Sequence, residues 1–91
     1  MAEAEYRVEI HRRAERDLRN LSPPNLRRVR VAIDSLSANP RPDGCKKLTG
    51  ADDIYRVRAG DYRILYRILD DVLLVIVIRA AHRSEVYRGL G

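Results

Sequence analysis

The sequence predicts an α+β fold with the element order β-α-α-β-β-β, in which an N-terminal helix pair packs on one face of an antiparallel sheet. Three observations predict it. Segments with the alternation of apolar and polar residues that is typical of strands lie near both ends of the chain. Two segments with helical spacing of apolar residues lie between them. The pair Gly60-Asp61 separates two alternating segments, as a two-residue hairpin turn does. Packing the helices on the sheet buries the apolar side of both.

The first strand and the first helix are expected between residues 6 and 21. Tyr6–Ile10 alternates strictly, which predicts a half-buried strand. From His11 the apolar residues follow a helical period, which indicates a short amphipathic helix with these residues on one side: Ala14, Leu18 and Leu21. Its outer side is rich in arginine, and Glu15 and Asp17 offset this charge only in part.

The second helix is expected to begin after Ser22 and to end before Pro40. Ser22 suits an N-cap, and Pro23 is tolerated at the first helical position. Proline at position 40 disfavours helical geometry in the residue before it. Residues 41–53 contain proline, glycine and aspartate and are predicted to be mostly irregular.

Residues 55–69 predict a β-hairpin. With Gly60 and Asp61 as the turn, Arg58 faces Arg63 and Tyr55 faces Tyr66. One face of the hairpin is then apolar and belongs to the core: Tyr55, Val57, Ala59, Tyr62, Ile64 and Tyr66. The other face carries Arg56, Arg58 and Arg63.

The last predicted strand is the continuous apolar segment 72–78, which belongs in the middle of a sheet with both faces covered. Asp70-Asp71 is expected to turn the chain into it. Residues 79–88 are polar and mixed in character, and we expect them to lie near the sheet and to fold back along its edge.

Three arginines on one face of a hairpin point to an anionic ligand. Like charges directly opposite each other on neighbouring strands are unfavourable by a few tenths of a kcal/mol to about 1 kcal/mol. An anion compensates this repulsion, and the planar guanidinium suits the oxygens of a phosphate. A phosphodiester is therefore the leading candidate ligand, and the alternative is a solvated basic face with no ligand.

The composition predicts a single small domain covering residues 1–91. Its basic charge favours an anionic partner. The net charge is +5 and the pI is about 9.9, and of the 18 basic residues only Lys46 and Lys47 are lysines. Such a balance points to nucleic acid or to an acidic protein partner. Lys46 and Lys47 either extend the basic patch or lie in a solvated loop.

The remaining features of the chain favour a cytoplasmic protein with no membrane role. The first five residues are acidic and lack the pattern of a signal peptide, and the segment 72–78 is too short to span a bilayer. Cys45 is the only cysteine, which excludes an internal disulfide and suits a reducing compartment. No activating motif surrounds Cys45, so a role as a catalytic thiol is disfavoured.

The order of elements and four motifs together resemble the RelE/ParE toxin superfamily of bacterial and archaeal toxin–antitoxin systems. The motifs are Lys-Leu-x-Gly at 47–50, Tyr-Arg-Val-Arg at 55–58, Gly-Asp-Tyr-Arg-Ile-Leu-Tyr at 60–66, and His-Arg-Ser-Glu-Val-Tyr at 82–87. The resemblance covers nearly the whole chain. As a set these motifs are moderately specific, and singly they are weak.

The resemblance implies a messenger-RNA interferase that enters the ribosomal A site. A ribose 2′-hydroxyl attacks the adjacent phosphate, giving a 2′,3′-cyclic phosphate and a free 5′-hydroxyl, with no metal or other cofactor. Arg63 matches the arginine that family members place on the scissile phosphate, and Tyr87 matches the C-terminal catalytic tyrosine. Arg56 and Arg58 match a basic pair that is lysine in the best-known pattern. Arginine binds phosphate but is a poor general base.

A second departure from the family pattern lies just before the last motif. Where some relatives carry another catalytic arginine, this chain has Ala81, followed by His82 and Arg83. His82 is either a catalytic acid or base, since histidine is the residue type whose unperturbed side-chain pKa lies near neutral, or an edge histidine without a chemical role. Arg83 is expected to join the phosphate-binding residues.

The resemblance also implies partners and leaves alternatives open. The partners are the ribosome, its mRNA, and a cognate antitoxin that forms a hetero-oligomer with the toxin. One alternative is a ParE-like toxin, which shares the fold but inhibits DNA gyrase. The other is a non-catalytic basic RNA-binding module.

Overall fold

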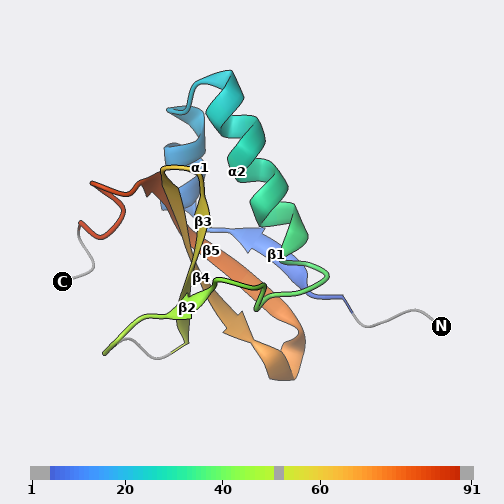
Figure 1. Ribbon diagram of the computed structural model, residues 1–91. Helices are drawn as coiled ribbons and strands as arrows, with labels where there is room; N and C mark the ends of the chain where they lie inside the picture. Colours follow the sequence, from blue (N-terminus) through green and yellow to red (C-terminus); the bar gives the residue numbers. More distant parts are fainter. Residues whose placement is uncertain (1–4, 51–52, 89–91) are drawn as a thin grey trace.

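The computed structural model describes residues 5–50 and 53–88, and it shows two helices packed against a five-stranded sheet (Figure 1). The elements in chain order are β1 (Arg7–Ile10), α1 (Arg12–Arg19), α2 (Pro23–Ser35), β2 (Lys46–Lys47), β3 (Ile54–Ala59), β4 (Tyr62–Leu69), the short 3-10 helix η1 (Asp70–Val72) and β5 (Leu74–His82). This confirms the predicted α+β class. Within these ranges neither helix is long and apolar enough to cross a membrane.

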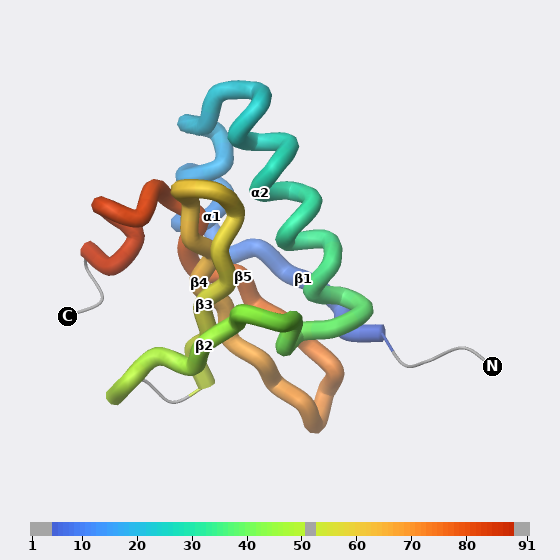
Figure 2. The backbone as a smooth tube through the Cα atoms, in the orientation of Figure 1, coloured from blue at the N-terminus to red at the C-terminus, as the bar shows by residue number. Residues whose placement is uncertain are grey.

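The sheet is mixed rather than fully antiparallel, with the strand order β1-β5-β4-β3-β2. β3, β4 and β5 form the predicted antiparallel meander, but β1 pairs with β5 in parallel, from Arg7 opposite Leu74 to Ile10 opposite Val77. The prediction of an antiparallel sheet was therefore wrong for β1. Alternation identifies a strand but does not determine which neighbour it pairs with or in which direction. The tube in Figure 2 shows how β5, which follows the hairpin, runs beside β1.

The hairpin has the predicted register. Arg58 lies opposite Arg63, Tyr55 opposite Tyr66, and Ala59 opposite Tyr62. Gly60 has a φ of +65°, a conformation that glycine adopts without strain.

The last strand begins later and ends later than predicted. Residues 70–72 form η1, Leu73 is left-handed with a φ of +51°, and the strand then continues to His82. The strand was predicted to end at Ile78, where the apolar segment stops, but residues 79–82 continue it. They remain extended because they pair with Tyr62–Leu65 of β4, beyond a bulge at Leu65 and Tyr66.

The main core lies between the helices and the sheet, and a smaller one lies on the other face of the sheet. Fully buried side chains from both helices and from β4 and β5 form the first: Ala14, Val29, Ile33, Ile64, Tyr66, Val75, Val77 and Ala80. The second contains Leu65, Ala81 and Val86, with Leu48, Ile54 and Ile78 packed against it. Val86 follows β5, so the second core fixes the C-terminal segment to the sheet.

Asp70, in η1 between β4 and β5, connects three parts of the chain that are distant in sequence. Arg41 donates to both carboxylate oxygens of Asp70, with N–O distances of 3.1 and 2.8 Å, and the Tyr6 hydroxyl donates to one of them at 2.5 Å. Arg41 also lies over the Tyr55 ring, 5.3 Å from its centroid. The hydrogen bonds from Arg41 and then from Tyr6 lower the pKa of Asp70 from 3.8 to about 2.

The lowered pKa predicts that Asp70 stabilises the fold above about pH 4 and that this contribution disappears as the pH falls through about 2. We expect Asp70→Asn to unfold at a lower temperature than wild type at pH 7, and the two proteins to converge near pH 2. Thermal unfolding followed by circular dichroism at several pH values measures this. Asp71→Asn is the matched control, because Asp71 is exposed and takes no part in the side-chain hydrogen bonds of residues 5–50 and 53–88. A difference between Asp70→Asn and wild type that is constant with pH would contradict the prediction.

Candidate functional site

The sheet face opposite the helices carries a group of cationic side chains, which we call the arginine face: Lys46, Arg56, Arg58 and Arg63. Pairing places them in register, since Lys46 lies opposite Arg56 and Arg58 lies opposite Arg63. On the other side of Arg63, β5 places Ala81 opposite it. The alternation of strands then directs these side chains away from the helices. Arg67 lies further along the same face of β4 and forms an ion pair with Asp53, at 3.5 Å.

Arg63 is surrounded by positive charge. The pKa of its guanidinium is lowered, first by partial burial and then by the charges of Arg58 and Arg56. Arg83 acts in the same direction, and the hydroxyl of Tyr87, when ionised, acts in the opposite one. Arg63 itself donates to the backbone carbonyls of Gly60 and Tyr62, at 2.9 and 3.1 Å, which holds it across the hairpin tip. An anion bound between these groups would relieve the repulsion.

Arg56 has an unsatisfied donor. Its Nε is buried and has no hydrogen-bond partner in the part of the chain that the structure describes. Leaving a buried donor unpaired costs about 1–3 kcal/mol. Arg56 also lines a hollow of about 280 Å³ together with Arg58, Lys46 and the loop residues Asp43 and Gly44. Donors of this kind around a hollow suit a phosphate or a ribose.

The C-terminal segment 83–88 brings Arg83 and Tyr87 to the arginine face. The backbone N–H of Arg83 donates to the carbonyl of Asp61 in the hairpin turn, at 2.9 Å, so the segment lies beside the hairpin tip (Figure 1). Val86 is fully buried, whereas Tyr87 is 43% exposed. Val86 packs against Leu65 and Ala81, and Ala81 lies opposite Arg63, so the segment that carries Arg83 and Tyr87 lies at the arginine face.

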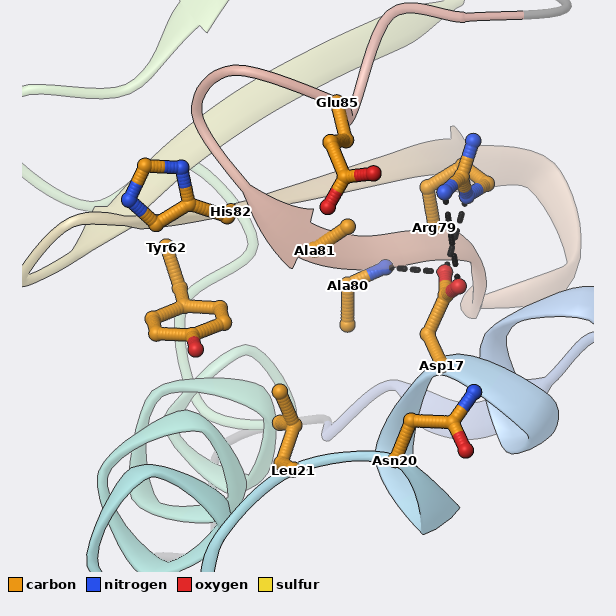
Figure 3. A pocket seen from close by; sticks show the side chains of 9 residues that line it. All are labelled: Asp17, Asn20, Leu21, Tyr62, Arg79, Ala80, Ala81, His82 and Glu85. Carbon is orange, nitrogen blue, oxygen red and sulfur yellow. Dashed lines mark hydrogen bonds and ion pairs between the residues drawn. The ribbon is translucent and has the colours of Figure 1, made fainter.

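His82 lies on the opposite face of the sheet from Arg63. It pairs with Tyr62, which faces the helix side and whose ring it meets edge-on at a centroid distance of 5.7 Å; Figure 3 shows the two side chains next to each other, with Tyr62 directed toward the helices. Its Nδ1 accepts the backbone N–H of Ser84 at 3.1 Å. The structure therefore does not bring His82 together with the arginine face. Lys47 lies opposite Tyr55, which also puts it on the helix side.

Asp17 and Arg79 form an interaction that the sequence did not predict. Asp17 was expected to balance charge on the outer side of its helix, but it accepts hydrogen bonds from Arg79 Nε at 2.8 Å and from the Ala80 backbone N–H at 2.9 Å (Figure 3). Its position was a signal, because residue 17 lies three residues after Ala14 and therefore on the apolar side of the helix. In residues 5–50 and 53–88, histidine, cysteine and acidic side chains do not gather in groups of three that could hold a metal ion.

Known proteins resemble this chain over most of its length. A family model described as the ParE toxin of the type II toxin-antitoxin system, parDE, matches residues 8–87. The toxin RelE1 of Methanocaldococcus jannaschii is 37% identical over 87 residues, which is 92% of this chain and 97% of that protein. The mRNA interferase toxin RelE of Escherichia coli is 29% identical over 86 residues, 90% of each chain.

Solved structures agree with these matches. The archaeal RelE-RelB complex from Pyrococcus horikoshii has a chain that superimposes with a TM-score of 0.76 at 30% identity. The superposition covers 89% of this chain and 98% of that one.

The clustered charge predicts that the arginine face binds a small oxyanion. Sulfate at ten times its dissociation constant would stabilise the wild-type protein by about 1.4 kcal/mol through binding to the folded state alone. We expect Arg63→Gln to lose most of this gain, measured as the shift in unfolding temperature with sulfate against chloride at equal ionic strength. Arg67→Gln is the control, because Arg67 lies on the same strand and face but already has a carboxylate partner. Equal shifts in all three proteins would contradict a specific anion site.

Proposed function

Because this chain belongs to the RelE/ParE toxin superfamily of type II toxin–antitoxin systems, we propose that it is an endoribonuclease toxin that cuts messenger RNA in the ribosomal A site. The observation that carries the proposal is the arginine face, where Arg58 and Arg63 lie opposite each other with Arg56 beside them. The repulsion between these facing positive charges is offset when an anion such as a phosphate binds between them. The relative named mRNA interferase gives the corresponding reaction class.

The proposed reaction is an attack of a ribose 2′-hydroxyl on the adjacent phosphorus. A bond forms between the 2′-oxygen and phosphorus, and the bond from phosphorus to the 5′-oxygen of the next nucleotide breaks. The 2′-hydroxyl loses a proton and the departing 5′-oxygen gains one, which leaves a 2′,3′-cyclic phosphate and a 5′-hydroxyl. Negative charge builds up on the phosphate oxygens in the transition state, and fixed cationic donors stabilise it more than the ground state.

The residues divide this work according to their positions. Arg63 is proposed to contact the scissile phosphate, since it is held at the hairpin tip by Gly60 and Tyr62. Arg56 and Arg58 are proposed to neutralise the developing charge, with Lys46 and Arg83 binding neighbouring phosphates. Arginine remains protonated, so the four arginines stabilise charge rather than transfer protons.

Tyr87 is proposed to take part in proton transfer, because its hydroxyl can both donate and accept and because the preceding residue, Val86, packs against Ala81, which lies opposite Arg63. His82 is left out of the proposed reaction, since it faces the helix side with Tyr62. Lys47 is left out of the phosphate contacts for the same reason.

The proposal includes the cellular context of the reaction. The protein acts in the cytoplasm, where ribosomes and mRNA are, and residues 1–91 act as one toxin domain. Its activity is controlled by a cognate antitoxin that binds it as a hetero-oligomer, as RelB is in complex with RelE in the Pyrococcus horikoshii structure. A basic sheet surface suits a partner segment that is acidic or amphipathic.

Inhibition of DNA gyrase, the ParE-like alternative, is not favoured. The matching family model carries the ParE description, but the fold is common to the superfamily and the site decides the function. Facing arginines at a hairpin tip suit the oxygens of a phosphodiester, which guanidinium groups bind in a bidentate manner, whereas contact with a protein gives no comparable reason for this arrangement.

The test is primer extension on a message loaded on programmed ribosomes, with naked RNA alongside. We expect wild type to cut within the A-site codon and Arg63→Ala to do so about 10²–10³-fold more slowly, since it removes a donor to the transition state. Tyr87→Phe should also slow the cut by about 10²-fold or more if its hydroxyl transfers a proton.

Arg67→Ala is the control and should cut at nearly the wild-type rate, because Arg67 is occupied by Asp53. An intact message together with inhibited gyrase supercoiling would overturn the proposal in favour of the ParE-like function. Binding to RNA without any cut would leave a non-catalytic RNA-binding module.

A further inference from the structure

The backbone on both sides of Tyr87 is attached to one buried arginine. Nη1 of Arg79 donates to the carbonyl of Val86 at 3.4 Å and to the carbonyl of Arg88 at 3.1 Å. These two residues flank Tyr87 directly. A single guanidinium group therefore contacts the chain immediately before and immediately after the tyrosine.

Arg79 is in turn fixed by α1. Its Nε and Nη2 donate to the two oxygens of Asp17, at 2.8 and 3.3 Å, and the side chains of Arg79 and Asp17 are only 9% and 14% exposed (Figure 3). Asp17 also accepts the backbone N–H of Ala80 at 2.9 Å. This N–H is free to bind Asp17 because β1 pairs with β5 only as far as Val77. The two-pronged geometry holds the guanidinium in one orientation.

The same segment has two further attachments. Arg13 of α1 donates to the carbonyl of Arg88 at 3.2 Å. Val86 is fully buried in the second core against Leu65 and Ala81. The backbone of residues 86–88 is thus held while the Tyr87 side chain stays 43% exposed.

We propose that Asp17 and Arg79 are positioning residues that hold Tyr87 beside Arg63 through the carbonyls of Val86 and Arg88. The inference rests on the proposed function, because it makes the cutting rate depend on an ion pair that does not touch the RNA. Residues 83–88 lie in turns, and such segments are mobile unless tied down. A misplacement of about 1 Å in a catalytic group can cost about 10²-fold in rate.

A double-mutant cycle on the cutting rate separates positioning from general stabilisation. The variants are Arg79→Met, Tyr87→Phe and the double substitution, assayed at saturating toxin on programmed ribosomes at a temperature where circular dichroism shows all of them folded. We expect Arg79→Met to lower the single-turnover rate by about 10-fold to 10²-fold while ribosome affinity stays unchanged. In the Tyr87→Phe background the same substitution should have little further effect, because both act on one group.

Independent, multiplying effects of the two substitutions would overturn the proposal, and so would an unchanged rate in folded Arg79→Met. Where Arg79→Met does not fold, Asp17→Asn replaces it in the cycle, since asparagine keeps an acceptor for the Ala80 N–H but removes the charge that orients Arg79. Arg67→Met is the control for removing an arginine from an ion pair on the neighbouring strand.

Amide hydrogen exchange tests the same proposal without any RNA. Exchange at residues 83–88 should be faster in Arg79→Met than in wild type and unchanged in Arg67→Met. If wild type does not cut ribosome-bound mRNA, the proposed function fails, and hydrogen exchange alone decides whether Arg79 holds the segment. Equal protection of residues 83–88 in Arg79→Met and wild type would overturn the positioning role.

Discussion

The turn at Gly60 and Asp61 fixes the register of the hairpin, and the arginine face depends on that register. A slip of one residue would move every side chain of a strand to the other face. Gly60 is left-handed, and a Cβ at this position would lie 2.5 Å from Nη1 of Arg28, a residue of α2. The exposed Arg28 side chain thus lies against the turn. The register that this turn fixes places Arg58 opposite Arg63 and directs the tyrosines of the hairpin into the core.

The two faces of the sheet have different physical tasks. The helix side buries aliphatic side chains and the Tyr66 ring, and hydrophobic burial there supplies the main stabilisation. The other side has only a small core, which ties the segment 83–88 to the sheet, and a cationic surface that repels itself. The stability supplied by the helix side therefore permits a cluster of positive charges on the opposite face. This cluster favours binding of an anion rather than folding.

The sequence predicted those features that depend on neighbouring residues. The hairpin register follows from the turn pair and the alternation beside it, and the N-cap at Ser22 follows from Ser22 and Pro23. The parallel pairing of β1 with β5 is not local, because the partners lie 67 positions apart in the chain, from Arg7 opposite Leu74 to Ile10 opposite Val77. The contact of Asp17 with Arg79 joins residues 62 positions apart.

The face of the sheet on which His82 lies can be predicted only when the length and the register of β5 are known. The apolar pattern stops at Ile78, but backbone pairing with β4 continues the strand to His82. The bulge near Leu65 then shifts the alternation, so that Ala81 joins the arginine face and His82 joins Tyr62. The periodicity of the side chains alone predicts neither the continuation of β5 to His82 nor the bulge near Leu65.

The account is tested most directly by the free energy of unfolding of Arg58→Gln relative to wild type, measured by urea denaturation at low ionic strength without multivalent anions. If the arginine face is arranged for a ligand, removing one of two facing charges should stabilise the free protein by a few tenths of a kcal/mol to about 1 kcal/mol. The gain should shrink when salt screens the charges. An Arg58→Gln variant that is less stable than wild type at low salt would contradict the account, because Arg58 would then serve the fold.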